Sequence, residues 1–267
     1  MGRLYFDEVD CFENFGIEVS AGDTYNASER DVEKVSVPGR NGDLILDNGR
    51  YMNIPIEYPA SIVRDFEKNS AAANLFFSAR AAGYYRLYDS YHSGDFADNY
   101  HGDYYRLARS MGGIQYSPVA LNRGANFTLR FDAKPQKFLI SGDTEYKIEL
   151  GEGIALVNPV NFESDPLIRL SNMKSATVIL FESDNFSTQI IVEPQEYILI
   201  DCELGVIHNG VRDLSHVVTM QKYPKLDIGG TFIKCWKRGA DGSDEYPADY
   251  EEIDWADITI TPRWWTI

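Results

Sequence analysis

The densest group of side chains that could do chemistry is an acidic run between residues 241 and 257. Carboxylate oxygens are the ligands that Ca²⁺ prefers, and two carboxylates can supply the acid and the base of glycoside hydrolysis. The run lacks the ordered spacing of an EF-hand loop, and 41 acidic residues in the chain give no basis for choosing a catalytic pair. A solvated hairpin tip is the simpler interpretation of this run, which holds Asp241, Asp244, Glu245, Asp249, Glu251, Glu252, Asp254 and Asp257.

Histidine, cysteine and serine residues show no catalytic or metal-binding spacing either. His92, His101, His208 and His216 form no HExxH motif, and the chain has neither a GxSxG motif nor a glycine-rich phosphate loop. The cysteines are odd in number and contain no CxxC pair, so a disulfide framework and a zinc knuckle are not indicated. We therefore predict a non-enzymatic protein without cofactor or metal, with buried free thiols at Cys11, Cys202 and Cys235.

The charge of the chain excludes one class of partner. A formal net charge of −16 argues against a phosphate-binding surface, which needs a clustered basic face. The N-terminus lacks the apolar core of a secretion signal, and no run is long enough to span a bilayer. We expect a soluble protein that is made in the cytoplasm without a signal peptide and binds neither nucleic acid nor membrane.

The aromatic residues fit either a protein interface or a well-filled core. The chain has 17 Tyr, 14 Phe and 4 Trp. Each tyrosine buries much area while it keeps a polar tip, which suits broad sheets and interfaces. The tryptophans could form a sugar-stacking platform, although core filling explains most of them equally well; they are Trp236, Trp255, Trp264 and Trp265.

Turn signals dominate residues 37–51. Asn41-Gly42 and Asn48-Gly49 are strong turn dipeptides because both residue types tolerate positive φ. Strand-like segments flank them at 30–37 and 43–46, and an extended pattern at 51–58 ends at Pro59. The pattern predicts a β-hairpin or a meander.

One helix is predicted, over residues 61–82, with an arm after it. Apolar residues recur there at helical spacing, with Ser61 placed as the cap and Gly83 as the stop. Segment 84–105 is dense in Tyr and Asp, which suits a long hairpin or extended arm better than a core strand.

The pattern changes near residue 138. Segment 126–133 alternates strictly, and its end at Lys134-Pro135 marks the predicted edge of a first domain, residues 1–137, with a charge balance of −4. Residues 138–267, with a balance of −12, show short strands without a helix, as expected for an antiparallel β-sandwich. The predicted strands are 145–149, 167–170, 176–182, 188–192, 197–201, 205–208, 217–221, 231–236 and 257–261.

The chain resembles a known family in several motifs that follow in order. In the first half these are Ser36-Val37-Pro38-Gly39-Arg40-Asn41-Gly42-Asp43-Leu44, Asn48-Gly49-Arg50-Tyr51, Ile56-Glu57-Tyr58, Tyr85-Arg86-Leu87-Tyr88-Asp89-Ser90, Tyr104-Tyr105-Arg106-Leu107-Ala108 and Phe131-Asp132-Ala133-Lys134-Pro135. In the second half they are Asn158, Pro166-Leu167-Ile168-Arg169, Ile200-Asp201-Cys202-Glu203, Tyr223-Pro224-Lys225-Leu226, Gly229-Gly230 and Thr261-Pro262-Arg263-Trp264-Trp265-Thr266-Ile267. Together they resemble the distal tail proteins (Dit) of siphophages.

This resemblance implies a mainly β protein at the tip of a phage tail, encoded by a phage or a prophage. Its N-terminal β-sandwich would carry one helix and a hairpin arm that embraces a neighbouring subunit. Its C-terminal domain would be a galectin-like or carbohydrate-module-like β-sandwich. The implied assembly is a ring, usually a hexamer, in the virion tail tip or baseplate. It would join the tail tube protein to the tail-associated host-facing protein (Tal) and, in some phages, to receptor-binding proteins.

Candidate contact residues come from the turn region and the tyrosine-rich segment. We expect them to face other subunits or partners, although Arg40 could equally brace its own domain; they are Arg40, Arg50, Tyr84, Tyr85, Tyr88, Tyr91, Tyr100, Tyr104 and Tyr105. A carbohydrate-binding module for host-surface adhesion is the alternative function, but the compact C-terminal half lacks long insertions. A glycan hydrolase rests on the acidic content alone.

Overall fold

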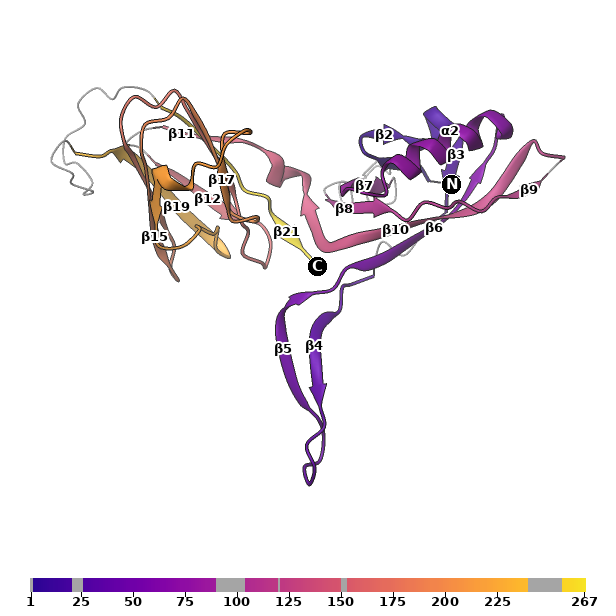
Figure 1. Cartoon of the computed structure of the whole chain (residues 1–267), viewed down its shortest axis with the longest axis horizontal. Coiled ribbons are helices and arrows are strands. Elements are labelled where there is room, and N and C mark those ends of the chain that lie inside the picture. The colour runs from indigo at the N-terminus through magenta and orange to yellow at the C-terminus, as the bar shows by residue number, and fades with distance from the viewer. Residues whose placement is uncertain (1, 21–25, 90–103, 120, 150–152, 240–255) are drawn as a thin grey trace. The chain divides into compact units, whose positions relative to one another are not determined.

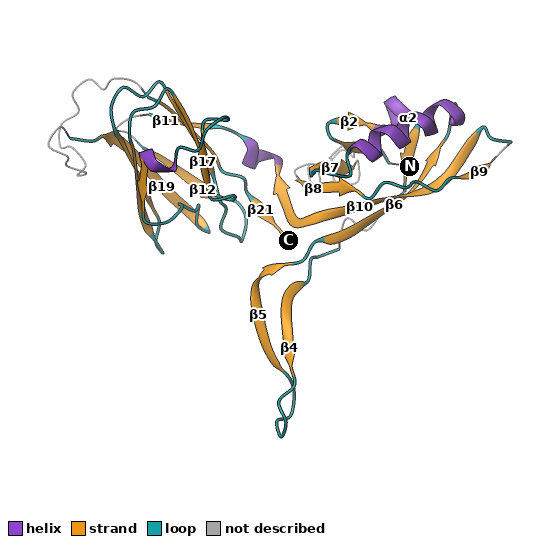
Figure 2. Ribbon diagram, viewed as in Figure 1, coloured by secondary structure: helices purple, strands orange, loops and turns teal. Residues whose placement is uncertain are grey.

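The structure is a computed structural model that describes all residues except 1, 21–25, 90–103, 120, 150–152 and 240–255. The chain folds into two compact units, Met1–Phe138 with Ile267, and Leu139–Thr266. Antiparallel strands make up most of both units, and this confirms the predicted mainly β class (Figures 1 and 2). Neither of the two described α-helices is long and apolar enough to cross a membrane.

The first unit is built on one curled sheet. Its strands follow the order β2-β1-β7-β8-β10-β6-β3, with β9 also paired to β10. A bridge between Gly2 and Val19, with N–H···O distances of 2.7 and 3.0 Å, brings the β1 end of the sheet back to β3. The strands are β1 (Leu4–Phe6), β2 (Val9–Asp10), β3 (Ile17–Val19), β6 (Ile54–Ile62), β7 (Tyr85–Asp89), β8 (Tyr104–Ser110), β9 (Ser117–Val119) and β10 (Gly124–Leu139).

An aromatic cluster fills the first unit. The ring of Phe6 lies 5.0 Å from Phe131, and 5.8 Å from both Phe77 and Tyr85, between ring centroids. Such packing comes from alternation, since every second residue of β6 is buried and its neighbours face solvent. Phe6, Phe77 and Phe131 are therefore core residues of this unit.

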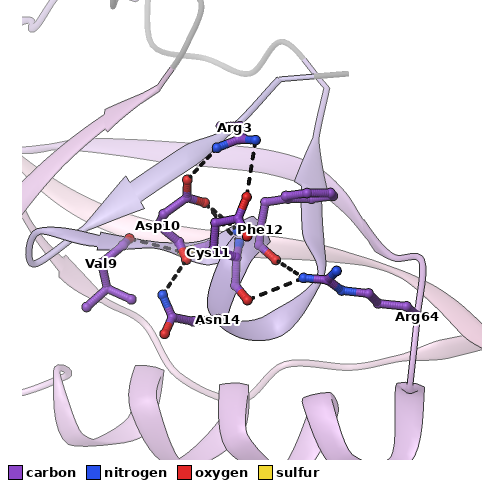
Figure 3. Close-up of polar contacts among 8 residues, drawn as sticks. Arg3, Val9, Asp10, Cys11, Phe12, Asn14 and Arg64 are labelled. Carbon is purple, nitrogen blue, oxygen red and sulfur yellow. Dashed lines mark hydrogen bonds and ion pairs between the residues drawn. The ribbon is translucent and has the colours of Figure 1, made fainter.

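The helix α1 (Cys11–Phe15) was not predicted from the sequence, because it is a single short turn. Asp10 caps it, as its Oδ1 accepts the N–H groups of Phe12 at 2.8 Å and Glu13 at 3.2 Å. At the other end Arg64 Nη2 donates to the carbonyl oxygens of Phe12 and Glu13 at 3.2 and 3.3 Å (Figure 3). The Phe12 carbonyl also accepts the Gly16 N–H at 2.8 Å, so the arginine adds a second donor there and supplies one to the Glu13 carbonyl at the end of the helix.

The main helix α2 (Phe66–Ala79) is shorter than predicted at both ends. The predicted cap, Ser61, lies in β6, because Ile62 next to it pairs with both Ala125 of β10 and Ile17 of β3. Asp65 stands at the true N-terminus, with φ of 45° and no side-chain capping bond. The helix ends at Arg80 rather than at Gly83. Tertiary strand pairing therefore overrides the helical spacing of residues 61–65.

Two strands run past prolines that were predicted to end them. Strand β6 continues through Pro59, whose carbonyl oxygen accepts the N–H of Ser20 at 2.9 Å. Strand β10 extends through Pro135 to Leu139 and does not stop at residue 133. Each proline lacks a donor but keeps its acceptor, so the strand continues with one ladder bond fewer.

The second unit is a sandwich of two five-stranded antiparallel sheets, ordered β11-β20-β13-β16-β17 and β12-β19-β14-β15-β18. All nine predicted strands are present, and β12, which was not predicted, completes the second sheet. Their bounds are β11 (Tyr146–Ile148), β12 (Ile154–Asn158), β13 (Leu167–Ser171), β14 (Thr177–Glu182), β15 (Ser187–Val192), β16 (Tyr197–Asp201), β17 (Val206–His208), β18 (Val218–Met220), β19 (Gly229–Lys237) and β20 (Asp257–Thr261), with β21 (Trp265–Thr266) after them.

Candidate functional site: an exposed hairpin arm

The most unusual surface of the first unit is a two-stranded hairpin that projects from the sheet (Figure 1). Its strands are β4 (Arg30–Val35) and β5 (Leu44–Tyr51), and among the described strands they pair only with each other. We call residues 30–51 the arm. Every residue of β5 except Tyr51 is exposed, so the arm shares almost none of the unit's core. The predicted hairpin is present here.

The tyrosine-rich segment 84–105 was predicted to form a long hairpin or an extended arm rather than a core strand. Its described parts form the antiparallel pair β7 and β8, as a hairpin requires, but both strands occupy inner positions of the sheet, and residues 90–103 lie outside the described residues. Leu87 is 3% exposed and Tyr105 is 8% exposed. The described tyrosines there are buried or half-buried apart from Tyr84, so tyrosine content did not distinguish an exposed hairpin from strands inside the sheet.

Only one of the two predicted turns reverses the chain. Residues 36–43, with Asn41-Gly42, form the tip, where Gly39 and Gly42 have φ of 82° and 80°. Asn48-Gly49 instead lies inside β5, near a shift of register between Arg30 and Val32. Gly49 takes φ of 75° there, as a glycine in a bulged strand can. The dipeptide therefore bends a strand that continues.

Cross-strand charges hold the arm together. Arg50 Nε donates to Asp31 Oδ2 at 2.7 Å, and Arg30 Nε lies 3.0 Å from each carboxylate oxygen of Asp47. The hydrogen bond from Arg50 holds the pKa of Asp31 below its usual value, and that from Arg30 does the same for the pKa of Asp47. These pairs are open to solvent and salt, so each stabilises the hairpin only weakly.

The apolar residues of the arm face solvent. Ile45 is 62% exposed, Leu46 is 44% exposed and Leu44 is 38% exposed. An isolated two-stranded hairpin is marginal in water, and each strand offers backbone groups along an outer edge that no described strand covers. The arm therefore combines exposed apolar side chains with two open strand edges, the chemistry of a surface that another chain covers. The sequence signal for this surface was Leu44-Ile45-Leu46, a run in which apolar and polar residues do not alternate, between Asp43 and Asp47.

The two candidate arginines lie in different settings. Arg40 is exposed at the tip of the arm. Arg50 is 76% exposed at its side chain and already bound to Asp31. Arg40 thus has its guanidinium open to a partner, while Arg50 braces its own hairpin.

The candidate tyrosines make contacts inside the first unit. Tyr84 accepts a hydrogen bond from Asn53 Nδ2 at 2.8 Å, and Tyr88 stacks on Tyr5 with 4.8 Å between ring centroids. Tyr105 stacks on Phe138 at 5.5 Å. The remaining described ones are half-buried, Tyr85 against Phe6 and Tyr104 at the start of β8; Tyr91 and Tyr100 lie outside the described residues. A role of these tyrosines between subunits stays a prediction.

The described residues contain little that could serve as a reaction centre. No group of three or more His, Cys, Asp or Glu side chains within them is placed to hold a metal ion. The cysteines are free and buried, and burial raises the pKa of Cys11 and Cys202 well above that of an exposed thiol. The cavity lined by Tyr58, Asp89 and Arg106 has about 20 Å³, space for one water molecule. The acidic run lies outside the described residues apart from Asp257, which is in β20.

The tryptophans do not form a platform among the described residues. Trp236 and Trp264 are buried, at 2% and 3% exposure, and Trp265 stacks on Phe162 with 4.6 Å between ring centroids. Trp255 lies outside the described residues. The described tryptophans therefore fill the second unit and leave no ring face assembled for a sugar.

Comparisons with known proteins found similar solved structures but no similar sequence. No protein-family model and no curated protein sequence matches the chain. Among solved structures, SPP1 Dit (gp 19.1), a paradigm of the hub of the adsorption apparatus in phages that infect Gram-positive bacteria, matches with a TM-score of 0.61 and 11% identity. A chain of the phage p2 baseplate in its activated conformation, solved with Sr and with Ca, matches with a TM-score of 0.51 and 12% identity. Each match covers 97% of both chains. The resemblance seen in the sequence is thus confirmed at the level of the fold: this chain has the fold of the Dit hub proteins over nearly its whole length.

Proposed function

We propose that this protein is a structural hub of a siphophage tail tip or baseplate. Copies of the chain would form a closed ring, most simply a hexamer, that connects the tail tube protein to the host-facing tail-associated protein and to receptor-binding proteins where a phage has them. The observation that carries the proposal is the arm, in a chain whose fold matches SPP1 Dit from end to end.

The arm supports self-assembly through its geometry. A projecting element on one side of a subunit and its receiving surface elsewhere make a head-to-tail contact, and such contacts close into rings when the rotation between subunits permits. Permanent rings of this kind bury apolar surface, and the exposed Ile45 and Leu46 supply it. An element this exposed has little value to an isolated chain, because it adds backbone to order without adding core.

Negative-stain electron microscopy and mass photometry of the pure chain test the proposal. We expect closed rings with a single stoichiometry, and images that show rotational symmetry. Monomers at every concentration, both alone and mixed with the host-facing tail protein of the same phage, would overturn the proposal. The mixture is needed because a partner can be the template on which the ring closes.

A further inference from the structure

The arm is joined to the sheet in two different ways. On its β5 side, the chain passes within two residues into β6, and Asn53 Nδ2 donates to Asp132 of β10 at 3.2 Å and to Tyr84 OH at 2.8 Å. On its β4 side, the chain approaches through residues 26–29, which belong to no strand. The β5 side is thus fixed by the sheet itself. On the β4 side, Ser28 Oγ donates to the carbonyl oxygen of Met52, and the Met52 N–H donates to Glu29 at 2.9 Å, so these residues are tied to the β5 side of the arm. A direct attachment of the β4 side to the sheet needs a further contact.

Arg106 of β8 provides that attachment. Its Nη2 donates to the carbonyl oxygen of Asn26 at 3.0 Å, and its Nη1 donates to the carbonyl oxygen of Pro135 in β10 at 2.8 Å. We call residues 26–29, which lead into β4, the arm's root. The planar guanidinium holds both donors in a fixed geometry, so one side chain sets the spacing between the arm's root and the sheet. Asn26 is 80 residues and Pro135 is 29 residues from Arg106 in the sequence, so these contacts are not local ones.

Burying the charged side chain of Arg106 costs free energy, which indicates that the arginine has a specific role at this position. The residue is 4% exposed, and burial lowers its pKa to about 10. A buried cation is tolerated only where its donors are satisfied, and here main-chain carbonyls do this. A methionine or leucine of similar volume would fill the same space without a desolvation cost, but it would leave the Asn26 carbonyl without this donor.

We infer that Arg106 is the positioning residue of the arm: it clamps the arm's root to β10 and so holds the arm in one direction before any other subunit binds. The benefit of such a clamp depends on the proposed function, because an arm that is already ordered loses less entropy when a ring closes. The inference concerns the order of the arm within one chain, and therefore it can be tested whether or not rings form.

The test measures the direction of the arm by electron–electron distance spectroscopy. Spin labels are placed at the tip, through Arg40→Cys, and on the exposed face of α2, through Leu75→Cys, where the leucine is 76% exposed. The three native cysteines are buried, and dilution with unlabelled protein restricts the signal to pairs within one chain. We expect a narrow distance distribution in the otherwise native protein, a broad one in Arg106→Met, and an intermediate one in Arg106→Lys, whose ammonium lacks the planar fork needed to hold both carbonyls.

The matched control is Arg130→Met, in the neighbouring strand β10. Arg130 is 64% exposed at its side chain, and its Nε lies 3.2 Å from Glu57 Oε1, which takes no part in holding the arm. We expect this variant to keep the narrow distribution. Hydrogen exchange of the Met52 amide, which donates to Glu29 at the root, should accelerate on the order of tenfold in Arg106→Met, as the loss of a hydrogen bond from a charged donor predicts, and remain unchanged in Arg130→Met.

A folded Arg106→Met protein with a native distance distribution and native exchange would overturn the inference, as would equal broadening in Arg130→Met. Should both Arg106 variants fail to fold, NMR of the guanidinium in the unsubstituted protein decides. Restricted rotation and slow exchange of the Arg106 η protons support the clamp, and freely rotating, rapidly exchanging η protons contradict it.

Discussion

Two antiparallel hairpins of the first unit, the arm and β7–β8, differ in what surrounds them. The described strands of β7–β8 lie between β1 and β10, with Leu87 and Asp89 buried at 3% and 0% exposure. The arm has no described strand on either side and leaves Ile45 62% exposed. Hairpin formation and burial are therefore separate properties: turns and alternation produce the first, while neighbouring strands produce the second. The hairpin within the sheet should control folding, and the arm should control assembly.

The largest difference is expected from one substitution made in each hairpin. Leu87→Ala removes a buried side chain from β7 and should lower the free energy of unfolding by about 2–5 kcal/mol. Leu46→Ala, on the exposed β5, should change it by less than about 0.5 kcal/mol. Urea unfolding of both variants makes the comparison, and equal losses would show that the arm is part of the cooperative core.

A smaller effect on stability should follow from removing the buried hydroxyl of Tyr58, which contacts Asp89 of β7. Tyr58 OH donates to Asp89 Oδ2 at 2.6 Å, and both residues have no exposed surface. Tyr58→Phe leaves the carboxylate with one donor fewer and should cost about 1.5–3 kcal/mol, because bonds to charged groups are the strong ones. Arg50→Met breaks the exposed pair with Asp31 and should leave global stability unchanged. Thermal unfolding of the two variants distinguishes a buried polar contact from an exposed one.

Two glycines with positive φ, one next to the sheet and one at the tip of the arm, should respond differently to substitution by alanine. Gly16 ends α1 with φ of 63°, and a Cβ there would lie 2.9 Å from Arg64 Cγ. Gly39 at the arm's tip has φ of 82°, and a Cβ there would meet nothing within 4 Å. Gly16→Ala should therefore cost about 1–2 kcal/mol from backbone strain and more from displacing Arg64. Gly39→Ala should affect only the order of the arm. Chemical denaturation and exchange of the arm amides separate these outcomes, and a global loss in Gly39→Ala would contradict them.

The smallest effect should be the response of the arm to acid. Asp31 and Asp47 have depressed pKa values in the folded arm, so their contribution is complete above the unfolded value near 3.9 and is lost as the pH falls through the folded pKa values. We expect the arm amides to lose exchange protection below about pH 4 while the sheet stays protected. Carboxyl chemical shifts in an NMR titration give both pKa values. Unshifted titration of both aspartates, or loss of the sheet at the same pH, runs against this expectation.

Helices and strands were predicted best from the sequence where the local pattern of residues alone determines them. In the second unit each strand needs only alternation and a following turn, and all nine predicted strands are present. Predictions failed where a distant partner decided the structure. Residues 61–62 have helical spacing but join β6, since β3 and β10 both pair with Ile62.

The candidate site could be predicted in part for the same reason. Asn41-Gly42 located the tip of the hairpin, because a reversing turn is a local property. The exposure of Leu44-Ile45-Leu46 could not be predicted from apolar residue type, since the same residues in an inner strand would be buried. Arg106 stood in a recognised motif, yet its acceptors at Asn26 and Pro135 meet only in the fold.

Mass photometry of a matched pair of arm and helix variants tests the central claim most directly. Ile45→Ser with Leu46→Ser removes the two most exposed apolar side chains of the arm, and Leu75→Ser changes a leucine on α2 that is even more exposed, at 76%. Both proteins should fold as the native chain does, judged by circular dichroism and thermal unfolding. The account predicts closed rings for the native chain and for Leu75→Ser, and monomers for the arm variant. Undiminished rings in the arm variant would contradict it.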